Sequence, residues 1–344
     1  MSESVSSGRE WRERRHREHD PRSYVSAWTE KDLLDEQVVD SFVIIFRTSG
    51  CYWAKSAGCA MCGYVLDTSL EVSEQDLMLQ LEKAAARHQG QPITKVYTSG
   101  SFFDEHEIPP EFRRAVLKEF GGRSKKLVVE TLAPFTKKNL MEEAFGYCDK
   151  FEVAFGLESA TPAVLKHAVN KPFGLQQHIN AAEIVHENGG TVKTYLLIKP
   201  PYLTEREAIE DAVSSAEKVA DCTDTISFNP VNVQKGTVVE RLWRRGEFRP
   251  PWLWSVVEVI DRTRQLRPRV MSDPTAAGLP RGAHNCGKCD NDVALAVKDF
   301  SLRLRSDFAG LDCDCREKWR DFLDLEGPLQ ASVDMDRILD WTES

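Results

Sequence analysis

The sequence predicts an α/β fold, a partial (β/α)6 TIM-like barrel, and two observations support this. Short apolar segments typical of strands alternate with amphipathic segments typical of helices across residues 38–266. Such alternation indicates a parallel sheet with helices packed outside it. Six strand–helix units are fewer than the eight of a closed barrel, so we expect an open barrel with its chemistry at the carboxyl ends of the strands.

Helix caps and glycines mark the boundaries of these units. Ser73 suits the N-cap of the first helix, and Gly189 and Gly190 end a later one. The predicted strands are Val38–Thr48, Thr94–Thr98, Lys126–Glu130, Lys150–Leu157, Thr191–Ile198 and Asp224–Phe228. The predicted helices are Ser73–Gln89, Pro110–Phe120, Thr136–Tyr147, Pro162–Val169, Leu175–Asn188, Glu205–Ala220, Thr237–Arg245 and Trp252–Leu266.

Composition limits the function classes. The 344 residues carry a net charge of −9, which argues against a broadly basic nucleic-acid binder but leaves local basic patches open. No apolar run is long enough for a membrane span, and the N-terminus lacks an apolar targeting region. Nine cysteines without a signal peptide indicate metal sites rather than disulfides. We therefore expect a cytoplasmic protein with no membrane partner.

Three regions are expected along the chain: a charged N-terminal extension at 1–35, the barrel at 36–266 and a metal-binding subdomain at 267–344. Arginines interleaved with acids make the extension either a solvated mixed-charge segment or an arm that touches phosphates. We favour the solvated segment. The arginines are Arg9, Arg12, Arg14, Arg15, Arg17 and Arg22.

A cysteine-rich loop follows the first predicted strand. Cys51, Cys59 and Cys62 have the spacing C-x7-C-x2-C, and the next histidine, His88, lies beyond a predicted helix. Three thiolates can hold three irons of a [4Fe–4S] cluster and leave the fourth iron open to a ligand. The alternatives are a zinc loop lacking its fourth ligand and three buried thiols. We favour the iron–sulfur loop.

Polar or permissive residues also follow the other predicted strands. They are Ser99, Gly100 and Ser101 after the second strand, Glu130 after the third, Glu158 and Ser159 after the fourth, and Lys199 after the fifth. Each is weak evidence alone, since Ser-Gly-Ser is usually a turn and a lone carboxylate often pairs with a surface lysine. Because parallel strands end at one edge, together they predict a site for a small polar ligand.

A second cysteine set lies near the C-terminus. Cys286 and Cys289 form a CxxC pair, and Cys313 and Cys315 form a CxC pair, joined by a predicted helix within 292–308. Four thiolates close a tetrahedral site, so we favour zinc over a second iron–sulfur cluster or no metal. His284 is an alternative ligand, although a lone histidine more often only forms hydrogen bonds. Cys148 and Cys222 are expected to be ordinary buried thiols.

The segment Arg241–Trp254 mixes arginines with aromatic side chains. Such a mixture can stack on bases and hold phosphates. It also fits a packing helix with tryptophans in the core and arginines in solvent, and this interpretation is slightly favoured.

These features together resemble the radical S-adenosylmethionine (SAM) superfamily. Within it the chain is most similar to the elongator-like branch, and there to the archaeosine-forming radical SAM lyases of archaeal tRNA modification. The motifs that carry the resemblance are C-Y-W-A-K-S-A-G-C-A-M-C-G-Y, Y-T-S-G-S-F-F-D, L-L-I-K-P-P-Y-L-T-E, H-N-C-G-K-C and D-C-D-C, within residues 38–320. One departure is the longer first spacing, since C-x3-C-x2-C is commonest in the superfamily.

The resemblance implies roles for the residues that match its motifs. Cys51, Cys59 and Cys62 would ligate a [4Fe–4S] cluster whose open iron is chelated by SAM. The cofactor-binding positions would be Met61 and Tyr64 near the adenine, Ser99, Gly100 and Ser101 at the methionine amino group, and Glu130, Glu158 and Ser159 around the methionine and ribose. Lys199 and Glu205 are candidates for holding a charged end of the substrate, although a structural role is favoured for each. No catalytic acid or base is implied.

The resemblance also implies an activity and its partners. The enzyme would cleave the lysine-derived C–N bond of a lysine-adducted 7-deazaguanine in the tRNA D-loop through a 5′-deoxyadenosyl radical, leaving the formamidine of archaeosine. Its partners would be tRNA, a lysine-transferring enzyme of the pathway and an electron donor. The alternatives are another tRNA-modifying radical SAM enzyme, elongator-like or methylthiotransferase-like, and a non-catalytic metal-stabilised RNA-binding protein.

Overall fold

The computed structural model describes residues 19–329. Five of the six N-terminal arginines, Arg9 to Arg17, lie outside this range, so the prediction for that segment stays a prediction. The chain divides into two compact units. The first comprises Met1–Gly58, Tyr64–Gly156 and Gln176–Lys193, and the second comprises Cys59–Gly63, Leu157–Leu175 and Thr194–Ser344. Among the described residues, no helix is both long and apolar enough to cross a bilayer.

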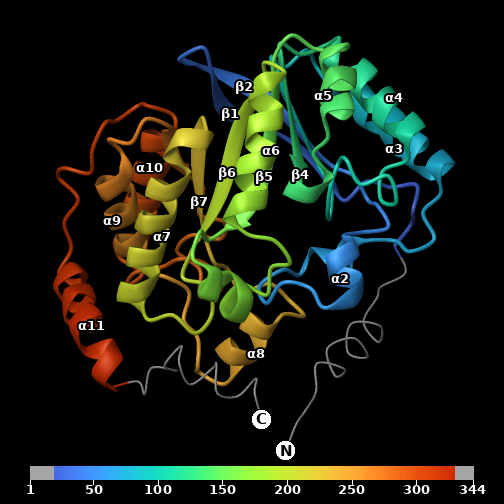
Figure 1. The fold of residues 1–344 in the computed structure, drawn as a ribbon. Coiled ribbons are helices and arrows are strands. Elements are labelled where there is room, and N and C mark those ends of the chain that lie inside the picture. The colour runs from blue at the N-terminus through green and yellow to red at the C-terminus, as the bar shows by residue number, and fades with distance from the viewer. Residues whose placement is uncertain (1–18, 330–344) are drawn as a thin grey trace, which may run out of the picture. The chain divides into compact units, whose positions relative to one another are not determined.

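The first unit is built on the first five strands, with helices between them (Figure 1). β1 pairs antiparallel with β2, and β2 through β5 pair in parallel. Phe42, Val43 and Ile44 on β2 are all buried, as expected for a parallel strand covered on both faces. The elements are β1 (Ser26–Leu34), β2 (Gln37–Ile45), α2 (Tyr52–Ser56), η1 (Tyr64–Asp67), α3 (Glu74–Arg87), β3 (Ile93–Tyr97), α4 (Pro110–Gly121), β4 (Lys126–Thr131), η2 (Ala133–Phe135), α5 (Lys138–Phe145), β5 (Phe151–Glu158) and α6 (Leu175–Glu187).

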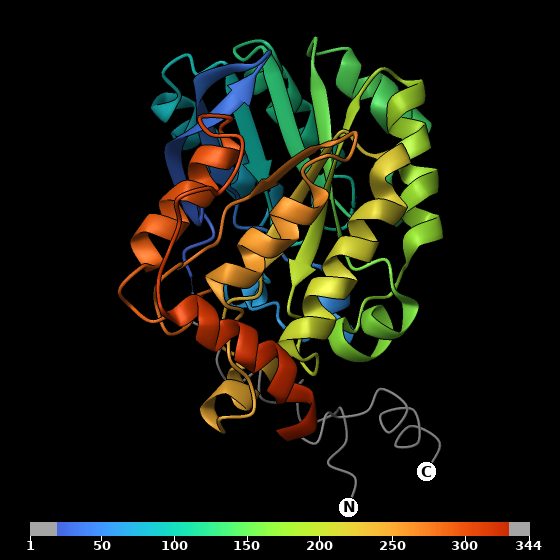
Figure 2. The ribbon, with the colours of Figure 1, turned by 90° about the vertical axis from the view of Figure 1, so that its left-hand side faces the viewer.

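The second unit packs its helices around Trp254, which is almost completely buried. In Figure 2, α7 in yellow and α9 in orange lie side by side, with α11 in red near their ends. β7 pairs in parallel with β8. The elements are η3 (Val164–Val169), β6 (Thr191–Ile198), α7 (Glu205–Val219), η4 (Ala220–Cys222), β7 (Thr225–Pro230), α8 (Val238–Arg244), α9 (Leu253–Thr263), β8 (Arg269–Ser272), α10 (Asp290–Ser301) and α11 (Cys315–Leu329).

The predicted fold class is confirmed. All six predicted strands are present, as β2 through β7, and along the sheet the strands follow their order in the chain from β1 to β8. Sequential order with helical crossovers is the arrangement of a barrel-type sheet, whereas a doubly wound sheet reverses its strand order. The mixed eight-stranded sheet is thus a half-barrel with one antiparallel strand at its edge.

The sequence analysis missed two strands and placed one helix end too late. β1 lies within the segment that was expected to be a charged extension. It was missed because its charged residues are typical of a solvated surface. β8 has four residues and begins with an arginine, so it offers no apolar run. The helix expected within 292–308 ends at Ser301, and Arg303 follows it with a φ of 55°.

Charged side chains form two buried clusters in the first unit. On β3, the Lys95 ammonium lies 2.7 Å from a carboxylate oxygen of Glu30 and 2.7 Å from one of Asp32, both on β1. The charges of β1 are therefore partners for a buried lysine. The second cluster has Glu152 of β5 at its centre, with Lys126 at 2.7 Å and Lys193 at 3.0 Å.

Candidate functional site

Cys51 follows β2 in the first unit, and the loop after β3 lies directly against it. Cys51 is the N-cap residue of the short helix α2. A Cβ atom added at Gly100 would lie 2.6 Å from Cys51 Cα and would also collide with the Glu107 carboxylate. Only a glycine leaves room for this approach of two loops. The structure therefore brings together two predicted site positions, Cys51 and Gly100, and gives the physical reason for the glycine.

Glu107 is a buried carboxyl group that the sequence analysis did not identify. It accepts hydrogen bonds from Thr48 Oγ1 at 2.6 Å and from the Ser101 backbone N–H at 2.7 Å. Burial raises its pKa to about 7, although these hydrogen bonds oppose the shift. Glu107 thereby ties the segment after β2 to the loop after β3. The only signal for it in the sequence is an acid in the loop that follows Ser-Gly-Ser.

Other predicted positions in the first unit lie around the same strand ends. The Ser99 hydroxyl donates weakly to the Tyr64 carbonyl at 3.5 Å. The Ser101 hydroxyl bonds to the Thr131 hydroxyl, and the Phe102 N–H donates to the Glu130 carbonyl at 2.9 Å. These contacts order the loop after β3 on the end of β4. Their contact with SAM stays a prediction.

The contact at Gly100 predicts a large effect for a small substitution. Gly100→Ala should lower the free energy of unfolding by about 1–3 kcal/mol, because the backbone of Cys51 has to move away from the added methyl group. Urea unfolding measures this change. The matched control is Gly174→Ala, whose Cβ would meet its nearest neighbour, Leu165 Cδ1, at an ordinary 3.7 Å. Equal unfolding midpoints for the two variants would contradict the assigned packing.

Cys59, Met61 and Cys62 belong to the second unit, where backbone bonds hold their loop. The Ala60 N–H donates to the Val169 carbonyl at 2.9 Å, and the Ala60 carbonyl accepts from the Val238 N–H at 3.0 Å. A turn closed by Cys62 N–H on the Cys59 carbonyl, at 3.3 Å, brings the two cysteines together. Cys59 and Met61 pack against the apolar cluster around η3 and α8. The loop is thus fixed on both sides within its unit.

Glu158 and Ser159, at the end of β5, are both engaged by neighbours in the second unit. The Glu158 carboxylate pairs with the Lys171 ammonium at 2.9 Å, and its φ is 75°. The Ser159 hydroxyl has no exposed surface and donates to Asp211 Oδ1 at 2.9 Å. Positive φ in a non-glycine residue costs about 1–3 kcal/mol and is typical of functional loops. Binding of the ribose by this pair stays a prediction.

Lys199 and Glu205 have the structural role that was favoured over binding of a substrate. The Lys199 ammonium lies 2.7 Å from Glu205 Oε2, and the residues are only 3% and 0% exposed. Glu205 Oε1 accepts further hydrogen bonds from the Trp252 N–H and the Ser255 hydroxyl. Because each charge is buried against the other, neither is available to a substrate. The sequence could not show this pairing.

The donor set of the first cysteine loop fits an iron–sulfur cluster with an open iron. All nine cysteines lie in the described part of the chain, and none forms a disulfide. Cys51 belongs to the first unit, while Cys59 and Cys62 belong to the second. Three thiols within twelve residues match the chemistry of three iron ligands. Within the first unit, the backbone of Gly100 lies directly against Cys51.

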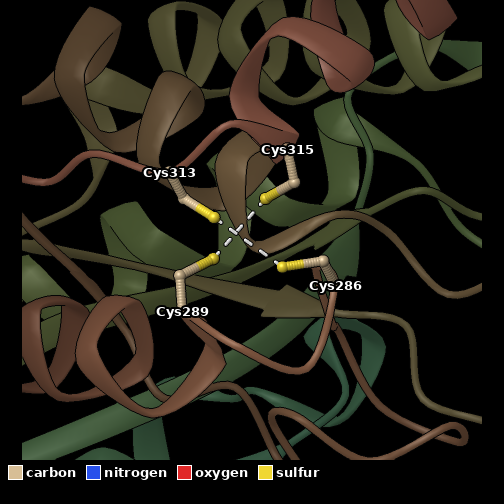
Figure 3. Close-up of side chains that lie close together, drawn as sticks. All are labelled: Cys286, Cys289, Cys313 and Cys315. Atoms are coloured by element: carbon tan, nitrogen blue, oxygen red, sulfur yellow. Dashed lines mark hydrogen bonds between the residues drawn. The ribbon is translucent and has the colours of Figure 1, made fainter.

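The second cysteine set forms a compact group (Figure 3). The sulfur atoms of Cys286, Cys289, Cys313 and Cys315 point toward one another and all lie within 4.8 Å of each other. The Cys286–Cys313 and Cys289–Cys315 sulfurs are 3.7 and 3.6 Å apart. Zn–S bonds of about 2.3 Å place tetrahedral sulfurs about 3.8 Å apart. The group could therefore bind one metal ion, and no histidine is needed to complete it.

Hydrogen bonds to sulfur support this group. Trp254 Nε1 donates to Cys315 at 3.2 Å, and Asn285 Nδ2 donates to Cys289 at 3.3 Å. The backbone N–H groups of Lys288 and Cys289 lower the pKa of Cys286 to about 7, against the effect of burial. Such donors stabilise thiolate charge, which is the form that binds metal. His284 instead bonds to the Gly282 carbonyl through Nδ1 at 2.8 Å.

The aromatic residues of Arg241–Trp254 are largely used for packing. Trp254 is 1% exposed, and the Arg249 guanidinium stacks on the Trp252 ring at 4.2 Å. Trp243 is covered by Arg281 at 4.9 Å. These contacts favour the packing interpretation, because rings in such positions are not open to bases.

No protein-family model matches the chain. A protein named archaeosine synthase subunit beta from Methanosarcina acetivorans is 41% identical over 311 residues, covering 88% of this chain and 90% of the relative. One of the same name from Thermococcus kodakarensis is 36% identical over 305 residues, covering 85% of this chain and 94% of the relative.

Solved structures give more distant similarities. Elp3 of the archaeon Methanocaldococcus infernus has 18% sequence identity and a TM-score of 0.48, with 70% of this chain and 60% of that chain covered. Methylornithine synthase has 9% identity and a TM-score of 0.44, with 92% of this chain and 90% of that chain covered.

Proposed function

The chain belongs to the archaeosine synthase subunit beta family, and on this basis we propose that it is a radical SAM enzyme that acts on tRNA in archaeosine formation. The observation that carries the proposal is 41% identity over 88% of the chain to a relative of that name. The cysteine loop at the end of β2 supports it, because its three thiols suit a cluster with an open iron.

Cys51, Cys59 and Cys62 would hold the [4Fe–4S] cluster. When bound, the cluster and SAM supply a radical that removes hydrogen from an unactivated carbon. The chain's own residues would bind and orient the cluster and SAM. Gly100 lets the loop after β3 approach Cys51, and Glu107 holds that loop by accepting a hydrogen bond from the Ser101 N–H. Glu130, Glu158 and Ser159 stand at the ends of β4 and β5, where a bound SAM is expected.

The reaction would be cleavage of the lysine-derived C–N bond of the modified base, leaving a formamidine. The target base has to leave its stack to reach the site, as for other enzymes that act on bases. No protein acid or base is needed to begin radical chemistry, so no catalytic residue is assigned.

We further propose that the C-terminal group binds zinc. The sulfur separations of 3.6 and 3.7 Å match thiolates on one tetrahedral ion. A four-iron cluster binds each thiolate to a different iron and holds the sulfurs farther apart. The group is closed by four thiolates, as in structural zinc sites, so a role in folding is favoured over one in catalysis.

The partners would be tRNA, the other subunit implied by the relatives' name, and an electron donor. The tryptophans of Arg241–Trp254 are packed, but Arg241 is exposed to solvent. Burial raises the pKa of Tyr202, and the positive charge of Arg241 opposes this shift. Tyr202 is itself 36% exposed. An exposed aromatic ring beside arginine suits RNA contact.

Anaerobic reconstitution tests the reaction. The protein is supplied with iron, sulfide, reductant, SAM and tRNA that carries the lysine-adducted base. We expect 5′-deoxyadenosine and the formamidine nucleoside to form together, measured by mass spectrometry of the digested tRNA, with unadducted tRNA as the control. A methylated or methylthiolated nucleoside would instead identify another tRNA-modifying radical SAM reaction. Absence of SAM cleavage would point to a non-catalytic RNA-binding protein.

A further inference from the structure

One face of α11 connects the four-cysteine group to the end of β6. Cys315 begins the helix, the Trp319 indole donates to the Ser255 hydroxyl at 2.8 Å, and the Phe322 ring lies 6.2 Å from that of Trp252. Glu326 follows on the same face. The positions 315, 319, 322 and 326 are spaced by four, three and four residues, which places them in one stripe along a helix.

At the far end of this stripe, Glu326 enters a buried charge cluster. Its carboxylate accepts a hydrogen bond from the Glu205 backbone N–H at the start of α7 and lies 3.7 Å from the Lys199 ammonium. Lys199 already has Glu205 at 2.7 Å, so the cluster holds two carboxylates and one ammonium. A second buried carboxylate is costly there, and burial raises the pKa of Glu326. The position of α11 therefore determines whether Glu326 reaches this cluster.

The loop next to this cluster is strained. Lys199 and Tyr202, in the loop between β6 and α7, have φ values of 63° and 74°. Each such residue costs about 1–3 kcal/mol and persists only where its surroundings impose the conformation. The conformation of Lys199 is held by its contacts with Glu205 and Glu326, and Glu326 belongs to α11. The strain of the loop is thus tied to the position of that helix.

At the near end, α11 begins at the cysteine group. Cys289 caps α10 and Cys315 is the first residue of α11, so one ion bound to both would join the two helices. The segment between the helices lacks regular structure apart from turns and bends. A bound ion would add a direct link between the two helices to the contacts of this segment, such as the stacking of Phe308 on Phe300 of α10.

We propose that the metal bound by the four cysteines anchors α11, and that Glu326 on this helix is a positioning residue for the loop 199–204 at the carboxyl end of β6. Strand ends of this kind carry the chemistry in barrel folds. In the proposed function, the second metal therefore shapes the substrate side of the site without taking part in the reaction. The substrate clause rests on the proposed tRNA reaction, and the anchoring of α11 rests on the proposed zinc site.

Hydrogen–deuterium exchange with mass spectrometry tests this on the full chain. Cys286→Ser removes the most exposed ligand, and Cys222→Ser, outside the group, is its control. We expect Cys286→Ser to lose zinc by elemental analysis and to increase exchange at least tenfold in peptides covering both 311–326 and 199–204. Exchange in β3 and β4 should not change. Zinc loss with unchanged exchange at 199–204 would overturn the proposal.

A second pair of variants tests the helix itself and remains informative if the cysteine variant does not fold. Glu326→Ala should increase exchange at 199–204 while zinc stays bound. Asp324 is an exposed acid on α11, two residues before Glu326, and it pairs with Arg206 of α7. Asp324→Ala should leave exchange at 199–204 as in the wild type. Equal exchange in the two variants would refute the role of Glu326. Because exchange requires neither SAM nor tRNA, these outcomes are separate from those that test the reaction.

Discussion

Cys59→Ala is expected to reduce SAM cleavage to background, because the radical chemistry is supplied by the cofactor and not by the protein. The variant should also lose the visible absorbance of the reconstituted cluster. The physical reason is that two thiolates cannot hold three irons of a four-iron cluster. Absorbance spectra, iron content and 5′-deoxyadenosine formation under reducing anaerobic conditions measure the effect.

The same experiment separates the two cysteine sets. Zinc content of Cys59→Ala should stay at the wild-type value, because its ligands lie at the other end of the chain. Cys222→Ala, which removes a half-buried thiol outside both sets, should keep cluster, zinc and activity. A Cys59→Ala protein with normal iron and normal SAM cleavage would eliminate the cluster assignment.

Glu152→Gln is expected to give the largest loss of stability, about 3–5 kcal/mol in the free energy of unfolding at neutral pH. The substitution keeps the shape of the side chain but leaves the buried Lys193 ammonium, 5% exposed, without the carboxylate that lies 3.0 Å away. Urea unfolding monitored by circular dichroism measures it. Glu210→Gln, which breaks an exposed pair with Arg262, is the control and should cost less than about 1 kcal/mol.

The pH dependence of Glu152 has a definite sign. Burial alone raises its pKa, but Lys193 and Lys126 outweigh burial and bring the pKa down to about 2 in the folded state. Because the pKa of Glu152 is lower in the folded than in the unfolded state, its ionised carboxylate stabilises the folded protein at pH values above the unfolded pKa. Wild-type stability should therefore fall as pH decreases from about 5 toward 2. The Glu152→Gln variant should show a smaller loss over that range, and parallel pH curves would contradict the assignment.

Local patterns in the sequence were sufficient for the fold class and for the grouping of the second cysteine set. Apolar segments of strand length, alternating with capped helices, predicted all six central strands, since burial imposes a periodicity that each segment carries itself. The second cysteine set was likewise found from spacing, because CxxC and CxC pairs place thiols close together in any turn. The first set, Cys51, Cys59 and Cys62, was proposed on the same ground and awaits its test.

Only the tertiary structure decided which charged side chains are partners. In the sequence β1 resembles a solvated extension, whereas in the structure its Glu30 and Asp32 pair with Lys95. The sequence favours a structural role for Lys199, and the structure identifies its partners as Glu205 and Glu326. For Glu107, beside Gly100, the sequence offered only an acid in the loop after Ser-Gly-Ser. The reason is physical: hydrophobic periodicity and ligand spacing act over a few residues, whereas the cost of burying a charge is offset by groups that can lie a hundred residues away.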